Sequence, residues 1–125
     1  MILGTGIDYI ETVRVERELA RGDWKTGDGI FTAGEIAFCT SSANPAGDYA
    51  ACFAAKEATM KALGVTPRDL SLFCEVELEA GRCHELRIRL HNRLKRESER
   101  LGVLGVRVSV AQNSRQTAVV VVLEN

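Results

Sequence analysis

The chain has 125 residues, of which 46% are hydrophobic and 26% are charged, and these values predict one domain over residues 1–125 with a substantial core. Its formal net charge of −1 argues against nucleic acid as a partner, because neutralising phosphates requires a surplus of basic side chains. The longest apolar run is too short to span a membrane, and Asp8 comes too early for a signal-peptide core, so no membrane partner is expected.

The N-terminal segment is predicted to form a strand over residues 2–10, followed by a helix over residues 11–21. Gly4 and Gly6 allow another group to approach the backbone of this strand closely. Strict alternation along a strand places both glycines and Asp8 on one face. Asp8 also has capping-box spacing before the helix, so it is expected to cap the helix N-terminus.

Two helices are predicted in the middle of the chain. Thr32 and Glu35 have capping-box spacing and open a short helix that continues through Cys39. A longer, alanine-rich helix covers residues 45–63 and ends at Gly64, a residue type typical of helix C-termini.

The long helix contains the first candidate for chemistry. Its apolar stripe is formed by Tyr49, Phe53, Met60 and Gly64. Glu57 falls inside this stripe, where a carboxylate is costly to bury unless a cation or hydrogen bonds satisfy it. Lys61 lies four residues later, and the spacing alone favours a Glu57–Lys61 salt bridge. The alternative is a metal-binding carboxylate beside a phosphate-binding lysine, with Asp8 as a second ligand for Mg²⁺.

The C-terminal half is predicted to be mainly strand. The expected strands cover residues 75–78, 86–90, 106–110 and 118–123, with a helix over residues 93–101. The last of these strands is continuously apolar, which is typical of a strand buried on both faces. The predicted fold class is therefore α+β, with helices packed on an antiparallel sheet.

Charged side chains are distributed unevenly along the chain. Residues 1–81 carry 7 basic and 13 acidic side chains, whereas residues 82–115 carry 9 basic and 3 acidic ones. The basic segment is either a solvated helix face or a surface for a polyanion or a neighbouring subunit. Arg14, Arg17 and Arg21 share one face of the first helix, which is either solvated or docks an acidic protein.

The four cysteines are Cys39, Cys52, Cys74 and Cys83. None of them forms a Cys-x-x-Cys pair, and the two histidines do not complete a zinc-binding pattern. Free thiols in a reducing cytoplasm are the simplest interpretation.

Several of these motifs together resemble one known family. Gly4-Thr-Gly-Ile-Asp8, followed by Glu11 and Arg14, resembles the N-terminal signature of holo-acyl-carrier-protein synthases, a branch of the 4′-phosphopantetheinyl transferase superfamily. Phe53-Ala-Ala-Lys-Glu57-Ala58 and then Lys61-Ala-Leu-Gly64 resemble its central signature. Further similar segments are Ile30-Phe31-Thr32 with Glu35, and Val108-Ser109 before the last strand. The resemblance covers essentially the whole chain.

The resemblance implies an activity and a set of partners. Members of this family move the 4′-phosphopantetheine arm of coenzyme A onto a serine of an acyl carrier protein, in fatty acid or polyketide biosynthesis, and they require Mg²⁺. The family is trimeric, with each site between subunits. This chain is therefore expected to act on coenzyme A and an acyl carrier protein as a cytoplasmic homotrimer.

The same resemblance implies roles for single residues. Asp8 and Glu57 would be the metal ligands, and Glu57, or a water that it holds, is a candidate general base. Lys61 would contact the coenzyme A phosphates. The other positions assigned to the coenzyme are Lys56, Gly64 and Arg107. Carrier docking is assigned to Arg14, with Arg17 and Arg21 on the same face.

The sequence also departs from the family pattern. Arg107 stands where the family usually has histidine, Cys52 where it has arginine, and Gln112 and Thr117 where many members have histidine and tyrosine. Arginine keeps a positive charge but cannot act as a base, so Arg107 is predicted to bind phosphate while proton removal falls to Glu57 or a metal-held water. Two alternatives remain open: altered chemistry on a carrier-bound or coenzyme-linked substrate, and a non-catalytic carrier-binding scaffold.

Overall fold

The computed structural model describes residues 1–22, 24 and 29–125. In chain order its elements are β1 (Ile2–Glu11), α1 (Thr12–Arg21), α2 (Ala33–Thr40), α3 (Pro45–Leu63), the 3₁₀ helix η1 (Leu70–Glu75), β2 (Val76–Ala80), β3 (Leu86–Leu90), α4 (Asn92–Arg100), β4 (Gly105–Gln112) and β5 (Gln116–Glu124). These elements confirm the predicted α+β class, with bounds that differ from the expected ones by one or a few residues.

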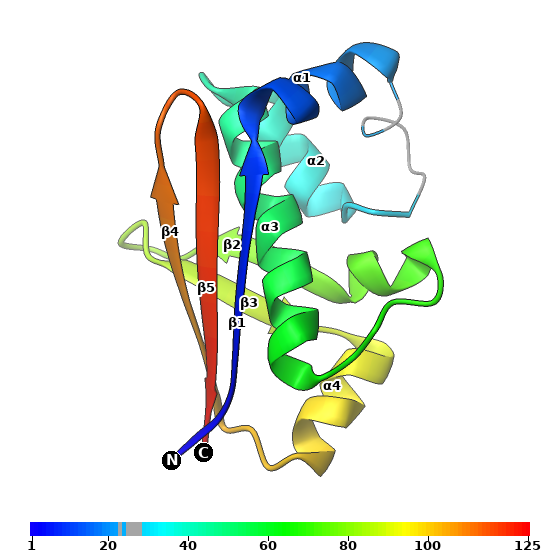
Figure 1. The fold of residues 1–125 in the computed structure, drawn as a ribbon, viewed down its shortest axis with the longest axis vertical. Coiled ribbons are helices and arrows are strands. Elements are labelled where there is room, and N and C mark those ends of the chain that lie inside the picture. The colour runs from blue at the N-terminus through cyan, green and yellow to red at the C-terminus, as the bar shows by residue number, and fades with distance from the viewer. Residues whose placement is uncertain (23, 25–28) are drawn as a thin grey trace.

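The strands form two antiparallel sheets, one of three strands in the order β1-β5-β4 and one that is the β2-β3 hairpin. Figure 1 shows the helices on one side of the three-stranded sheet, with α3 lying along β1 and β5. Both chain ends lie at the same end of this sheet, where the Asn125 amide donates to the Met1 carbonyl. Among the described residues, no helix is long and apolar enough to cross a membrane.

The helix α3 packs directly on the backbone of β1 at two glycines. A Cβ at Gly6 would overlap the Ala58 carbonyl oxygen, and one at Gly4 would overlap the Ala62 carbonyl oxygen. The sequence prediction that these glycines admit a close neighbour is confirmed. The close neighbour is the backbone of α3.

The two faces of β5 differ, so the prediction of a strand buried on both faces is wrong. Val119, Val121 and Leu123 are fully buried against the helical layer, whereas Val120 is 38% exposed. Val120 pairs with Ile7 of β1, which is 64% exposed, and Tyr9 on the same face is 60% exposed. We call this side of the three-stranded sheet, away from α3, the open face.

The helix termini follow the local sequence signals, with one exception. Thr32 and Glu35 form the predicted capping box, and Gly64 ends α3 with φ 71°. The exception is α1, whose N-cap residue is Glu11 and has no side-chain cap hydrogen bond. Asp8 lies within β1, three residues before this N-cap, so its predicted capping role is wrong.

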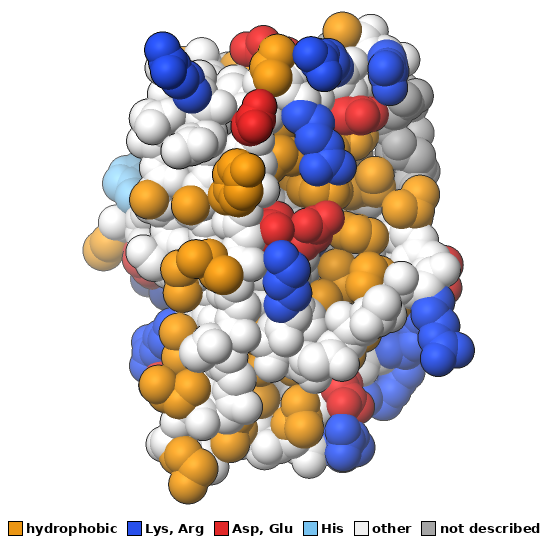
Figure 2. All heavy atoms as spheres, viewed as in Figure 1, with side chains coloured by type: hydrophobic (Ala, Val, Ile, Leu, Met, Phe, Trp, Pro, Cys, Tyr) orange, Lys and Arg blue, Asp and Glu red, His pale blue; other side chains and the backbone are white. Residues whose placement is uncertain are grey.

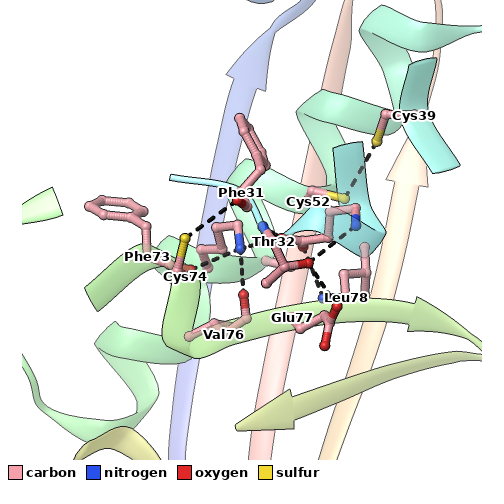
Figure 3. Close-up of polar contacts among 12 residues, drawn as sticks. Phe31, Thr32, Cys39, Cys52, Phe73, Cys74, Val76, Glu77 and Leu78 are labelled. Carbon is pink, nitrogen blue, oxygen red and sulfur yellow. Dashed lines mark hydrogen bonds and ion pairs between the residues drawn. The ribbon is translucent and has the colours of Figure 1, made fainter. Parts of the chain in front are cut away.

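A buried ion pair joins α2, α3 and β2. The Lys56 ammonium lies 2.6 Å from Glu35 Oε1 and also donates to the carbonyls of Phe73, at 2.8 Å, and Val76. The other Glu35 carboxylate oxygen accepts from the Leu78 amide at 3.1 Å. Both side chains of the pair are fully buried. The neighbouring Thr32 hydroxyl donates to Glu77 at 2.7 Å (Figure 3).

Candidate functional site

Asp8, Glu57 and Lys61 meet where β1 crosses the C-terminal half of α3. The Lys61 ammonium lies 3.0 Å from Asp8 Oδ1 and 3.1 Å from the Ile7 carbonyl oxygen. The Lys61 side chain is 55% exposed and the Asp8 side chain 12% exposed, so the lysine lies outward of the carboxylate. Figure 2 shows acidic and basic side chains together in the middle of this face. The spacing-based expectation of a Glu57–Lys61 salt bridge is wrong, because Lys61 pairs with Asp8 instead.

Glu57 has an unusual protonation equilibrium. Burial, then a hydrogen bond with Asp8 and the Asp8 charge, raise the pKa of Glu57 from its usual 4.5 to about 7. The positive charges of Lys61 and Arg14 oppose this shift. Near neutral pH the carboxyl group of Glu57 is therefore partly protonated beside Asp8, because two adjacent negative charges disfavour each other.

Such a carboxyl pair fits a hard divalent cation. Mg²⁺ usually takes one or two protein carboxylates and completes its coordination with water and substrate phosphate oxygens. The described residues contain no group of three or more acidic, histidine or cysteine side chains that could hold a metal by themselves. Asp8 and Glu57 thus suit a cation that a phosphorylated substrate helps to bind, and their role as metal ligands stays a prediction.

Arg14 lies at the edge of this site, a position that the sequence analysis did not predict when it assigned Arg14 to carrier docking. Its guanidinium carbon is 5.5 Å from the centre of the Phe53 ring, and its charge lowers the pKa of Glu57. The sequence shows that Phe53 lies one helical turn before Glu57 on α3. It does not show that Phe53 faces α1, because that contact depends on how the two helices pack. Arg14 and Arg17 line a surface hollow of about 410 Å³ between β1 and α1. Arg21 lies farther along α1, with its guanidinium 3.9 Å from Glu18.

Comparison with known proteins gives a consistent result over the full chain. Residues 4–120 match the 4′-phosphopantetheinyl transferase superfamily. The chain belongs to this superfamily. It is 38% identical over 125 residues to the holo-[acyl-carrier-protein] synthase of Solibacter usitatus, covering 100% of both chains.

Solved structures agree with this assignment to the transferase superfamily. The crystal structure of holo-[acyl-carrier-protein] synthase from Neisseria meningitidis is similar with a TM-score of 0.88 and 25% identity, covering 100% of both chains. The Bacillus anthracis holo-(acyl-carrier-protein) synthase in complex with CoA (3′,5′-ADP) is similar with a TM-score of 0.77 and 25% identity. That likeness covers 98% of this chain and 96% of the other.

Two of the predicted coenzyme-binding residues have different environments in this transferase fold. Lys56 is fully buried, and its ammonium already donates to three oxygens, so no N–H is left for a ligand in this arrangement. Gly64 ends α3 one turn after Met60, where a Cβ would meet only open space. A cavity of about 200 Å³ beside it is lined by Glu57, Lys61 and three further residues. Lys56 is therefore structural here, whereas Gly64 is next in the chain to Val65, which lines this cavity.

Arg107 lies on the opposite side of the sheet from the Asp8–Glu57–Lys61 group. It pairs in register with Val122, and Val122 pairs with Thr5, so all three side chains share the open face. The Arg107 side chain is 74% exposed, and its Nε lies 2.7 Å from Glu124 Oε1. Within one chain the structure does not bring Arg107 to the other predicted site residues.

The remaining departures from the family pattern have partners inside the protein. Gln112 donates from Nε2 to the Gly47 carbonyl and to the Thr117 hydroxyl, both at 2.8 Å. Together these two hydrogen bonds connect β4 and β5 to the start of α3. Cys52 is buried, with its sulfur 3.9 Å from that of Cys39. Gln112, Thr117 and Cys52 thus complete local packing at the N-terminal end of α3.

Proposed function

We propose that this chain transfers the 4′-phosphopantetheine arm of coenzyme A to a serine of an acyl carrier protein, releasing adenosine 3′,5′-bisphosphate. The observation that carries the proposal is the convergence of Asp8, Glu57 and Lys61 from two distant motifs. Full-length relatives named holo-[acyl-carrier-protein] synthase support it. We place the activity in the cytoplasm, since four cysteines without disulfides suit a reducing compartment.

Asp8 and Glu57 would hold the Mg²⁺ ion. When bound, the ion neutralises the negative charge of the coenzyme A pyrophosphate. The chain itself supplies Lys61, whose exposed ammonium can contact a phosphate without leaving Asp8. The Glu57 carboxylate, or a water that it holds, would accept the proton of the attacking serine.

The carrier protein would dock on the face of α1 that carries Arg14, Arg17 and Arg21. All three arginines are exposed, and Arg14 adjoins the site, so an acidic carrier bound there has its serine near Glu57. Reversing the three charges to glutamate should slow association and weaken its dependence on salt, because rim charges mainly steer the encounter. Unchanged carrier binding by the triple variant would exclude this surface.

We further propose that the protein is a homotrimer that pairs subunits through the open face. Ile7 and Tyr9 present an exposed apolar surface there, and Leu104 near the chain ends is 87% exposed. Figure 2 shows hydrophobic side chains along the strands. Because β1 is an edge strand of the sheet, a neighbouring subunit that covers this surface and extends past the edge would bring its own Arg107 toward the Asp8–Glu57–Lys61 group. Light scattering should give about three times the 13.7 kDa chain mass, and a stable monomer at micromolar concentration would exclude the trimer.

The transfer reaction has a direct test. A panel of apo acyl carrier proteins is incubated with coenzyme A and Mg²⁺ and analysed by mass spectrometry for addition of one phosphopantetheine. Lys61→Met should lose most of the activity, whereas Lys95→Met, which removes an exposed lysine of α4, should retain it. If the native protein modifies no carrier but still binds one, the scaffold alternative replaces this proposal. If the native protein instead modifies a carrier that already holds phosphopantetheine, the altered-chemistry alternative replaces this proposal.

A further inference from the structure

Two cysteines from different helices lie side by side in the core, next to the N-terminal half of α3. Cys39 is in the last turn of α2 and Cys52 in the second turn of α3, and their sulfurs are 3.9 Å apart (Figure 3). Cys39 is fully buried and Cys52 is almost so. Neither the transferase chemistry nor the carrier-docking surface uses this pair.

A cavity gives small molecules access to one of these sulfurs. It has a volume of about 360 Å³ and lies between α2, α3, the β2-β3 hairpin and β4, with Cys52 in its wall. The wall is mainly apolar. Its charged side chains are the carboxylates of Asp48, Glu77 and Glu79, and none of the described residues that line it is a lysine or arginine. The cavity therefore favours small uncharged molecules and disfavours anions.

We propose that Cys39 and Cys52 form a reversible oxidation site for small uncharged peroxides such as hydrogen peroxide. Peroxide oxidises the Cys52 thiol to a sulfenic acid and is itself reduced to water. The Cys39 thiol then attacks the sulfenic sulfur, forming the Cys39–Cys52 disulfide and releasing a second water. The sulfurs must move from 3.9 Å to about 2.0 Å apart.

The surroundings of the pair set how fast it reacts. The hydrogen bond with Cys39, together with burial, raises the pKa of the Cys52 thiol well above its usual range. Because the thiolate is the reactive form, oxidation is slow at neutral pH and accelerates as pH rises. The Tyr49 hydroxyl is buried and has no hydrogen-bond partner among the described residues. Burial raises the pKa of Tyr49, and the negative charges that the Cys39 and Cys52 thiolates would carry raise it further. The unused Tyr49 hydroxyl therefore lies close to the two sulfurs.

The disulfide would join α2 to α3 across the connection that contains residues 41–44. It closes a short loop, which restricts the unfolded chain and raises the temperature of unfolding. Because α3 also carries Glu57 and Lys61, the link braces the helix that positions the catalytic group. Oxidised protein should therefore unfold several degrees higher than reduced protein, and reduction with dithiothreitol should reverse the shift.

Peptide mapping can identify the bond without ambiguity. Trypsin cleaves after Lys25 and Lys56, and the peptide of residues 26–56 contains Cys39 and Cys52 and no other cysteine. After treatment with hydrogen peroxide, alkylation under denaturing conditions and digestion, this peptide should be unalkylated and about 2 Da lighter than the dithiol form. If it instead carries two alkyl groups while Cys83 is oxidised, the proposal is wrong.

Variants and a charged oxidant sharpen the test. Cys83→Ser, which removes the exposed thiol, should keep both the mass loss and the increase in unfolding temperature. Cys39→Ala should abolish both. The ratio of the glutathione disulfide rate to the diamide rate should be at least ten-fold lower at the pair than at the exposed Cys83, because glutathione disulfide is large and carries carboxylates and the cavity is narrow and acidic. Equal ratios at the two places, or persistence of the mass loss in Cys39→Ala, would contradict the assigned site.

Discussion

Glu57 is the residue whose protonation should depend most clearly on the fold. Its folded pKa of about 7 exceeds its usual 4.5, so the folded state holds a proton that the unfolded state releases. Ionising Glu57 in the folded state lowers the free energy of unfolding. This loss is absent below pH 4.5, grows between pH 4.5 and 7, and is complete above pH 7. In metal-free protein, Glu57→Gln should therefore raise the unfolding temperature at pH 8, with the benefit fading toward pH 4.5.

A matched control for this prediction is Glu97 on α4. A hydrogen bond from Arg100 lowers the pKa of Glu97, so its carboxylate stabilises the folded state at neutral pH. Glu97→Gln should leave the unfolding temperature at pH 8 unchanged or slightly lower. If thermal melts with excess chelator show that Glu57→Gln destabilises the protein equally at both pH values, the pKa of Glu57 is not raised.

Helical spacing could identify Glu57 but not its hydrogen bond with Asp8, which the sequence analysis paired with it only as a second metal ligand. Its place in an apolar stripe signals an unusual environment, because a buried carboxylate needs compensation. Helical spacing suggests only local partners, so it pointed to Lys61. The actual hydrogen-bonding neighbour, Asp8, is on a strand about fifty positions away, and only the packing of β1 on α3 brings it close.

At the scale of elements, the buried Lys56–Glu35 pair should be the most sensitive junction. Lys56→Met leaves the Glu35 carboxylate buried without a cation, which costs about 3–5 kcal/mol of unfolding free energy. Lys61→Met, which removes the mostly exposed partner of Asp8, should cost less than about 1 kcal/mol. Denaturant unfolding measures both values.

A double variant separates the charge from the packing at this junction. Glu35→Gln combined with Lys56→Met removes both charges and keeps an oxygen that can accept from the Leu78 amide. It should be more stable than Lys56→Met alone, because no unpaired charge remains. Additive losses from the two substitutions would mean that the two side chains do not stabilise each other.

The contact between α3 and β1 should tolerate no side chain at Gly6. Gly6→Ala would force a Cβ onto the Ala58 carbonyl oxygen and separate the helix from the strand, at a cost of about 1–3 kcal/mol or more. Because Asp8 and Glu57 lie on these two elements, transferase activity should fall with stability. The control is Gly105→Ala, whose Cβ would meet the flexible Glu124 side chain at 3.1 Å. If Gly6→Ala has the same free energy of unfolding as the wild-type protein, the helix and strand are not packed this closely.

Local chemistry predicted the helices better than the exposure of the strands. The Thr32–Glu35 capping box and the glycine after α3 act within a few residues, so they can be read from sequence. The burial of β5 depends on which layers cover its sheet, and a run of valines contains no information about that. The Asp8 spacing was misleading for the same reason, because β1 continues to Glu11 by pairing with β5.

At the scale of the whole molecule, family motifs predicted the fold and singled out Asp8, Glu57 and Lys61, which the structure brings together. They did not indicate that Arg107 lies on the open face, on the other side of the sheet from Glu57. That separation follows from strand register, since Arg107, Val122 and Thr5 form one row across β4, β5 and β1. A site that uses both Arg107 and Glu57 therefore needs two chains.

Co-expressed subunits that carry different substitutions should restore each other's activity. Glu57→Gln removes one half of the proposed site and Arg107→Ala weakens the other, most clearly at low coenzyme A concentration. In randomly mixed trimers, about a quarter of the interfaces combine an intact Glu57 with an intact Arg107, so activity should recover to that fraction. Mixing Glu57→Gln with Asp8→Asn should restore nothing, because both residues belong to the same half. Transfer assays on the two mixtures, compared with each parent variant, decide the matter: equal failure of both mixtures would mean that Arg107 does not complete a site across subunits.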